Sequence, residues 1–139
     1  MNDIPAATLA PQPDYSSYIA GWKRRQQLEK AAIEKRRAEA RQIAVQATEI
    51  LKQHGATKVI LFGSALDHTF KLDSDIDLAV EMPSAAWWKW YLKLGEMLNF
   101  PIDLVHLGKI NEGFREMIFQ FGEVIYENEK WDCGSSNSN

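Results

Sequence analysis

Two short apolar runs in this sequence each carry an aspartate among side chains that are otherwise typical of a strand interior. The runs are residues 76–80 (IDLAV) and 102–107 (IDLVHL), which contain Asp77 and Asp103. Apolar runs of this length, bounded by polar residues or proline, are typical of buried β-strands. Burying an isolated ionised carboxylate costs on the order of several kcal/mol. The fold must therefore bring these two side chains to a place where a cation or solvent offsets that cost.

The rest of the chain alternates between strand-like and helix-like segments. A further strand is expected at residues 58–62, which end at a Gly-Ser pair, and a last short strand at residues 123–126. A helix is expected at residues 85–98 with Ser84 as its N-cap. A second is expected after Asn111, which can cap it, through about residue 121, where Gly122 ends it. This alternation predicts an α+β fold, in which helices pack on a small mixed β-sheet.

A long helix is expected before the first strand, because residues 16–54 contain no proline and only one glycine, Gly21. Its second half carries an amphipathic stripe formed by Ile43, Ala47, Ile50 and Leu51. Residues 22–41 hold eight basic and three acidic residues and few large apolar ones. We expect this basic arm to project from the body or to dock on a partner, with a merely solvated face as the alternative. Nucleic acid is disfavoured as its partner, because the whole chain has a net charge of −3 and a pI of about 5.6.

Four segments follow from this pattern. They are a flexible lead at residues 1–14, the basic helical arm at 15–42, a folded domain at 43–127 and a disordered polar tail at 128–139. No run approaches the roughly 20 apolar residues of a membrane span, and the N-terminus lacks the pattern of a secretory signal. The single cysteine, Cys133, excludes a disulfide framework and favours a reducing, cytoplasmic location.

Three aspartates form a candidate metal site. Asp75 and Asp77 are two residues apart, a spacing that places both side chains on one side of a strand, and Asp103 lies near the start of the following strand. Three gathered carboxylates repel one another unless a cation neutralises them. Oxygen ligands on rigid strands suit a hard divalent ion, and Mg²⁺ in particular binds through carboxylates together with substrate phosphates.

Gly63 and Ser64 end the first strand and form a candidate phosphate site. Glycine allows the backbone to approach a ligand closely, and the amides and hydroxyl that follow can bind phosphate oxygens. A phosphate site beside a metal site favours nucleotidyl transfer, in which metal ions bridge phosphate oxygens.

These residues resemble the nucleotidyltransferase superfamily that includes DNA polymerase β. The resemblance is carried by the pattern G-S-x10-D-x-D over residues 63–77, and Asp103 matches the third aspartate of that family. Residues 73–80 (DSDIDLAV) are especially similar to the minimal nucleotidyltransferases, or MNT domains. The resemblance covers roughly residues 43–127 and implies the polymerase β-like nucleotidyltransferase fold for them.

The resemblance implies transfer of AMP from ATP to a protein hydroxyl. MNT proteins of this size commonly act as antitoxins that AMPylate a tyrosine of a HEPN-type ribonuclease toxin, so the implied partner is such a toxin in a hetero-oligomer. In this interpretation Asp75 and Asp77 hold two Mg²⁺ ions, and Asp103 completes the coordination of the ion that activates the hydroxyl. Gly63 and Ser64 bind the triphosphate.

One position departs from the family pattern. Family members often carry arginine directly after the Gly-Ser pair, whereas this chain has Ala65, and the loop offers Lys71 and His68 as other basic groups. The departure favours an alternative function, a non-catalytic protein of the same fold that neutralises its partner by occlusion. A third alternative, modification of a small molecule, is disfavoured because about 85 residues leave no second domain to enclose the substrate.

The helix expected at residues 85–98 has an apolar arc of about 220°, wider than a surface helix normally buries. Either another segment of the chain covers the excess, or Trp88 and Leu92 anchor a protein interface. The three histidines show no metal-ligand spacing and are expected at the surface or in packing roles; they are His54, His68 and His106.

Overall fold

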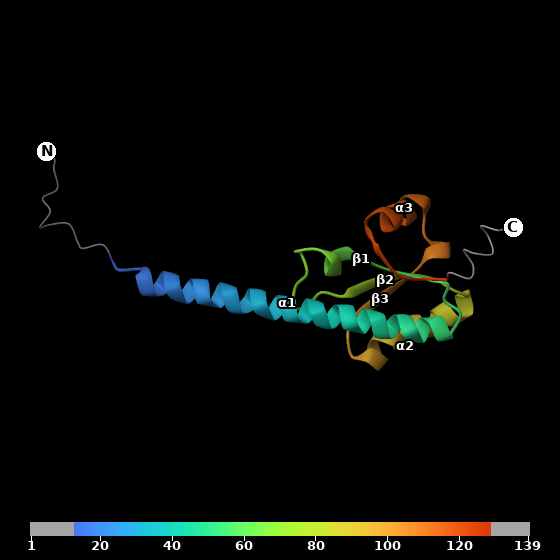
Figure 1. Ribbon diagram of the computed structural model, residues 1–139, viewed down its shortest axis with the longest axis horizontal. Helices are drawn as coiled ribbons and strands as arrows, with labels where there is room; N and C mark the ends of the chain where they lie inside the picture. Colours follow the sequence, from blue (N-terminus) through green and yellow to red (C-terminus); the bar gives the residue numbers. More distant parts are fainter. Residues whose placement is uncertain (1–12, 129–139) are drawn as a thin grey trace, which may run out of the picture. The chain divides into compact units, whose positions relative to one another are not determined.

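The computed structural model describes residues 13–128, and its elements follow the expected order (Figure 1). These are α1 (Ser16–Gln53), β1 (Lys58–Phe62), the 3₁₀ turn η2 (Gly63–Leu66), β2 (Ile76–Glu81), α2 (Ser84–Leu98), β3 (Ile102–His106), the 3₁₀ turn η3 (Leu107–Lys109), α3 (Glu112–Phe121) and β4 (Glu123–Glu127). The expected polar tail with Cys133, and most of the expected N-terminal lead, lie outside the described residues.

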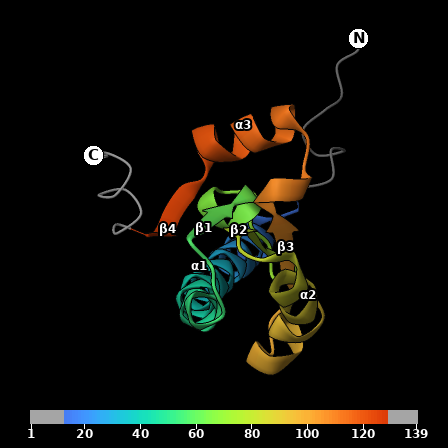
Figure 2. The ribbon, with the colours of Figure 1, turned by 90° about the vertical axis from the view of Figure 1, so that its right-hand side faces the viewer.

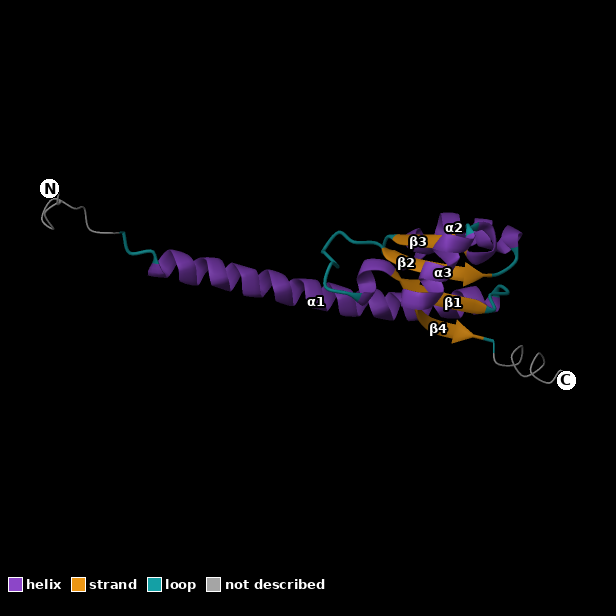
Figure 3. Ribbon diagram, turned by 90° about the horizontal axis from the view of Figure 1, so that it is seen from above, coloured by secondary structure: helices purple, strands orange, loops and turns teal. Residues whose placement is uncertain are grey.

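The four strands form one mixed sheet, in the order β3-β2-β1-β4 (Figure 3). β1 runs antiparallel to both β2 and β4, whereas β2 and β3 are parallel. A parallel pair needs a crossover connection, and α2 supplies it between β2 and β3. The predicted α+β class, with a small mixed sheet and a long N-terminal helix, is confirmed.

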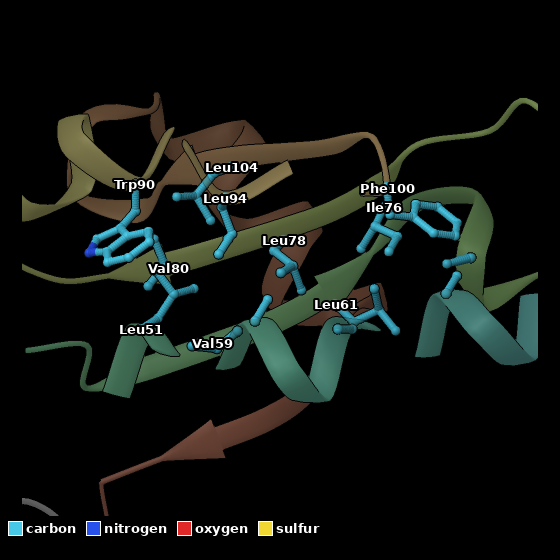
Figure 4. Close-up of a cluster of buried hydrophobic side chains, with 14 of the residues drawn as sticks. Leu51, Val59, Leu61, Ile76, Leu78, Val80, Trp90, Leu94, Phe100 and Leu104 are labelled. Atoms are coloured by element: carbon cyan, nitrogen blue, oxygen red, sulfur yellow. The ribbon is translucent and has the colours of Figure 1, made fainter. Parts of the chain in front are cut away.

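Helices lie on both faces of the sheet (Figure 2). The part of α1 that follows residue 33 and α2 cover one face, and α3 covers the other. The larger core lies between α1, α2 and the sheet, where side chains such as Leu51, Leu78 and Leu94 interlock (Figure 4). A buried side chain of this size contributes about 1.5–3 kcal/mol relative to an exposed one. This layer therefore holds β2 and β3 in place against α2.

α1 packs on the sheet through small side chains. Its buried residues are Ala40, Ala44, Ala47, Thr48 and Leu51, so burial begins three residues before Ile43, where the predicted amphipathic stripe starts. The Thr48 hydroxyl donates to the carbonyl of Ala44 at 2.7 Å, which satisfies the polar group inside this layer. The chain divides into two compact units, one ending at Ala32 and the other beginning at Ile33. No helix within residues 13–128 has the length and apolar character needed to cross a membrane.

Capping residues define the ends of the two later helices. The Asn111 side chain accepts a hydrogen bond from the Phe114 amide at 2.8 Å, which starts α3 as expected. Asn99 ends α2 in the left-handed conformation, with φ 56°. Ser84, by contrast, is not the N-cap that a serine at this place suggests; it is the first helical residue of α2, and Pro83 precedes it.

Candidate active site at the start of β2 and β3

The register between β2 and β3 brings two of the predicted site residues together. Asp77 on β2 pairs directly with Asp103 on β3, so the two side chains leave neighbouring strands on the same face of the sheet. Asp77 is also opposite Phe62, the last residue of β1. Residues of this parity, such as Ala79, pack in the core under α3. Asp77 therefore stands between the end of β1 and the start of β3, on the face that α3 partly covers.

Burial and like charge raise the pKa of Asp77 to about 6. Burial of the carboxyl is the largest cause, followed by the negative charges of Asp103 and then of Asp75. Asp75 precedes β2, and both it and Asp103 are exposed, whereas Asp77 is partly buried. The three carboxylates are thus close enough to act on one another, with two of them open to a ligand from solvent.

Gly63 lies against this cluster. Its backbone has φ +81°, and a β-carbon at this position would overlap Oδ2 of Asp77 and lie 3.1 Å from its Cγ. Only glycine fits both the conformation and the contact. The following residue, Ser64, is partly buried in the same 3₁₀ turn, and Ala65 is buried. The predicted phosphate site and the predicted metal site are therefore adjacent.

An arginine from α1 supports this turn. Nε of Arg37 donates to the carbonyl oxygen of Ala65 at 2.9 Å. From sequence, Arg37 is only one residue of the basic arm, and Lys71 and His68 are the predicted basic groups of the loop. Both Lys71 and His68 are exposed. The run of basic residues at 22–41 is the sequence feature that could have indicated a cation near the turn, and it does not distinguish Arg37 from its neighbours.

Other residues of the loop and of β3 have structural roles. Hydrogen bonds from Thr69 hold the pKa of Asp67 below its ordinary value, including one from the Thr69 amide to Oδ1 at 2.9 Å. His106 is buried, its Nδ1 accepts from the Gly108 amide at 3.1 Å, and its ring packs on Trp87. Burial lowers the pKa of His106, which fits the expected packing role.

Among residues 13–128, no three His, Cys, Asp or Glu side chains converge on one metal position. The donors at the Asp75, Asp77 and Asp103 positions are nevertheless all carboxylate oxygens, the ligands that Mg²⁺ prefers. Burial, and then the negative charges of Asp103 and Asp75, raise the pKa of Asp77, and a bound cation would offset all three effects. The residues present therefore fit a hard divalent cation, provided that the exposed side chains of Asp75 and Asp103 turn toward Asp77.

A groove adjoins the cluster on the α2 side of the sheet. It has a volume of about 700 Å³, and its lining includes Arg36, Asp75, Tyr91, Glu96, Asn99 and Phe100. The guanidinium of Arg36 stacks over the Phe100 ring at 3.8 Å. Because Asp75 lines this groove, a molecule bound in it would reach one edge of the carboxylate cluster.

Strand carboxylates beside a glycine turn can bind the phosphates of a nucleotide together with a metal ion. The fold and the site are therefore those expected of a nucleotidyltransferase. The family model described as "Polymerase beta, Nucleotidyltransferase" matches residues 46–130, more than half of the chain. The chain belongs to this family, as its resemblance predicted. No protein of curated function matches the sequence.

Solved structures share the fold. A chain of the MntA-HepT toxin–antitoxin crystal structure is 21% identical with a TM-score of 0.51, over 66% of this chain and 76% of that one. A chain from the complex of tri-AMPylated Shewanella oneidensis HEPN toxin with MNT antitoxin is 22% identical with a TM-score of 0.51, over 67% and 76%. A toxin–antitoxin structure with AMP-PNP is 25% identical with a TM-score of 0.52, over 61% and 73%.

Proposed function

We propose that this protein transfers AMP from ATP to a protein hydroxyl, and that the acceptor is a tyrosine of a HEPN-type toxin for which this chain is the antitoxin. The observation that carries the proposal is the direct pairing of Asp77 with Asp103 beside the Gly63 turn. Two strand carboxylates and a close backbone approach thus lie side by side, and Asp75 is near enough for its charge to raise the pKa of Asp77. The similar structures, in which an antitoxin chain of this fold is found with its toxin, support the choice of partner.

Each site residue has a role in this proposal. Asp75 and Asp77 would hold two Mg²⁺ ions and Asp103 would complete one of them; bound there, the ions would neutralise phosphate oxygens and favour ionisation of the acceptor hydroxyl. The bare backbone of Gly63 and the hydroxyl of Ser64 bind the triphosphate. The acceptor hydroxyl loses its proton to solvent water and its oxygen attacks the α-phosphorus in line. The bond from the α-phosphorus to the oxygen that bridges to the β-phosphate breaks, and pyrophosphate leaves with that oxygen.

The exposed face of α2 is the proposed surface for the partner. Trp88 and Leu92 are 56% and 61% exposed, and Trp88 stacks on the exposed ring of Tyr91, with ring centroids 5.7 Å apart. Large aromatic side chains of this kind are enriched in the energetic centres of protein interfaces. Tyr91 and Leu92 also line the groove that reaches Asp75, so a partner on this face could bring its acceptor side chain to Asp75, at the edge of the cluster. The basic arm is the second proposed contact.

Intact-mass measurement of the HEPN-type partner tests the proposal. The partner is co-expressed with this protein, and separately with its Asp77→Asn variant, which removes a metal ligand with little change in shape. We expect additions of whole adenylyl units with the parental protein and none with the variant. Equal masses in both samples, with the complex still formed, would overturn the enzymatic assignment.

A second candidate function is neutralisation of the partner by occlusion alone. The absence of a charged side chain at Ala65, together with the wide exposed aromatic face of α2, favours it. Calorimetry with ATP and Mg²⁺ separates the two functions, because a protein that acts by occlusion alone needs no affinity for the nucleotide.

A further inference from the structure

We infer that Arg37 is a positioning residue of the nucleotide site, which fixes the turn at Gly63–Leu66 and places a positive charge beside the triphosphate. This inference rests on the proposed function. Its starting point is the hydrogen bond from Nε of Arg37 to the carbonyl of Ala65, which joins residues 28 positions apart in the chain.

Ala65 and Leu66 pack the turn onto the larger core, and hydrogen bonds set the direction of its amides. Phe62, at its N-cap position, makes no side-chain capping hydrogen bond, and the bond from the Asp67 amide to the Ser64 carbonyl closes the turn at 3.1 Å. A single 3₁₀ turn is a short and weak element. Because the Arg37 bond reaches the carbonyl in its middle, the orientation of the amides around Ser64 depends on this side chain.

Arg37 is itself held in place. It lies on α1 one turn before Ala40, the first buried residue of that helix, and its side chain is only 28% exposed. Its guanidinium pairs with Glu34 on the preceding turn, with Nη1 and Oε2 3.8 Å apart. A guanidinium has five N–H donors in a rigid fork, and the bond to Ala65 uses one, so the group retains donors of the kind that bind phosphate.

Electrostatics support the same role. The carboxylates of Asp75, Asp77 and Asp103 repel a triphosphate, and Ala65 adds no positive charge to the turn. The charge of Arg37 does reach this loop, since it is one of the smaller contributions that lower the pKa of Asp67, after the hydrogen bonds from Thr69 and the charge of His68. α1 thus supplies a cation from outside residues 46–130, the part that matches the family.

Calorimetric titration with two nucleotides tests this inference. In the presence of Mg²⁺, the full chain and its Arg37→Gln variant are titrated with α,β-methylene-ATP, which cannot be cleaved at the reacting bond, and with AMP. We expect the variant to bind α,β-methylene-ATP about tenfold more weakly or worse, the ratio that about 1.4 kcal/mol represents. Its affinity for AMP is expected to change less than threefold, because AMP lacks the β- and γ-phosphates beside Arg37.

Two further variants control the experiment. Arg41→Gln removes the same charge one helical turn later, from a side chain that bonds Glu123 at 2.7 Å instead of the turn, and is expected to bind both nucleotides as the parent does. Arg37→Lys retains the charge without the planar fork and is expected to recover part of the lost affinity. Thermal unfolding of each variant shows whether the fold is retained.

The outcomes separate this inference from the proposed function. If the parental protein binds neither nucleotide, the proposed function and the inference fall together. If the parent binds α,β-methylene-ATP and Arg37→Gln binds it equally well, only the inference falls. An equal loss of affinity for AMP and for α,β-methylene-ATP also overturns it, because that result would mean that Arg37 only stabilises the fold and has no role at the β- and γ-phosphates.

Discussion

Gly63 lies against the carboxylate of Asp77, so closely that a β-carbon at residue 63 would overlap the Oδ2 atom. This contact joins the end of β1 to the start of β2 at the point where the chain turns. Because φ of Gly63 is +81°, a side chain would be strained here even without the contact. The glycine therefore fixes how near the backbone turn comes to the carboxylate cluster.

Gly63→Ala is expected to destabilise the protein and to weaken nucleotide binding. The left-handed backbone alone costs about 1–2 kcal/mol for a residue with a β-carbon, and displacement of Asp77 adds to it. Denaturant unfolding and calorimetry with ATP and Mg²⁺ measure the two effects. Gly21→Ala is the matched control: it lies within α1, its β-carbon would meet only Nη1 of Arg25 at an ordinary 3.7 Å, and it is expected to stabilise the helix by about 0.5–1 kcal/mol. Equal stabilities for the two variants would contradict the contact.

The contribution of Asp77 to the stability of the protein without metal is expected to fall as pH rises from about 4 to about 6. The pKa of Asp77 is raised from 3.8 to about 6 in the folded state, so in this window the folded protein binds more protons than the unfolded chain. The loss is expected to be about 1–2 kcal/mol, since partial exposure screens the interaction.

Asp77→Asn should flatten this part of the pH profile. Denaturant unfolding in the presence of EDTA, at intervals between pH 4 and 7, provides the measurement. Asp67→Asn is the control, because the hydrogen bonds from Thr69 lower the pKa of Asp67 and its contribution has the opposite sign, below pH 4. A difference in stability between the parent and Asp77→Asn that stays constant across the window would show that Asp77 is not a buried, repelled carboxyl.

The strands, and the aspartates within them, could be predicted from sequence because short apolar runs and the period of two are local properties. The pairing of Asp77 with Asp103 could not. Parallel strands joined through a helix have no tight turn to set their register, and a slip of one residue would move Asp103 to the other face. Packing of α2 against β2 and β3 decides that register, and packing depends on the whole core.

The contribution of Arg37 was beyond sequence reasoning for a similar reason. Eight basic residues occupy positions 22–41, and helical periodicity shows only which of them share a face. Which one reaches the turn at residues 63–66 depends on how α1 lies on the sheet, and the small side chains of Ala40 and Ala44 determine how closely it approaches. Neither the distance between α1 and the sheet nor the direction of the Arg37 side chain can be inferred from neighbouring residues in the sequence.

Mg²⁺ is expected to stabilise the parental protein at pH 7. Binding at the carboxylate cluster neutralises like charges, and a ligand present at ten times its dissociation constant adds about 1.4 kcal/mol to the free energy of unfolding. Thermal unfolding with Mg²⁺ and with EDTA measures this difference. Asp77→Asn should lose most of it, whereas Asp73→Asn, in the exposed loop before β2, should retain it. The same shift in both variants would place the ion elsewhere.

The α2 face can be separated from the nucleotide site by mutation. The double variant Trp88→Ala/Leu92→Ala truncates two side chains that are more than half exposed, so little stability should be lost and the affinity for ATP with Mg²⁺ should stay unchanged. Its affinity for the HEPN-type partner is expected to fall at least tenfold, because aromatic anchors commonly contribute more than 1 kcal/mol to an interface. Titration of the purified partner measures this affinity.

The control for that experiment lies on the other face of the sheet. Met117→Ala/Phe121→Ala removes two large apolar side chains from α3, which are 42% and 69% exposed, and is expected to bind the partner as the parent does. The comparison therefore holds the loss of exposed apolar surface roughly constant and changes only its position. If both double variants lower the affinity for the partner equally, non-specific contact with exposed apolar surface explains the effect. If only the α3 variant weakens it, the toxin docks on the face that also carries Asp77 and Asp103, and the groove beside α2 has no part in delivering the acceptor.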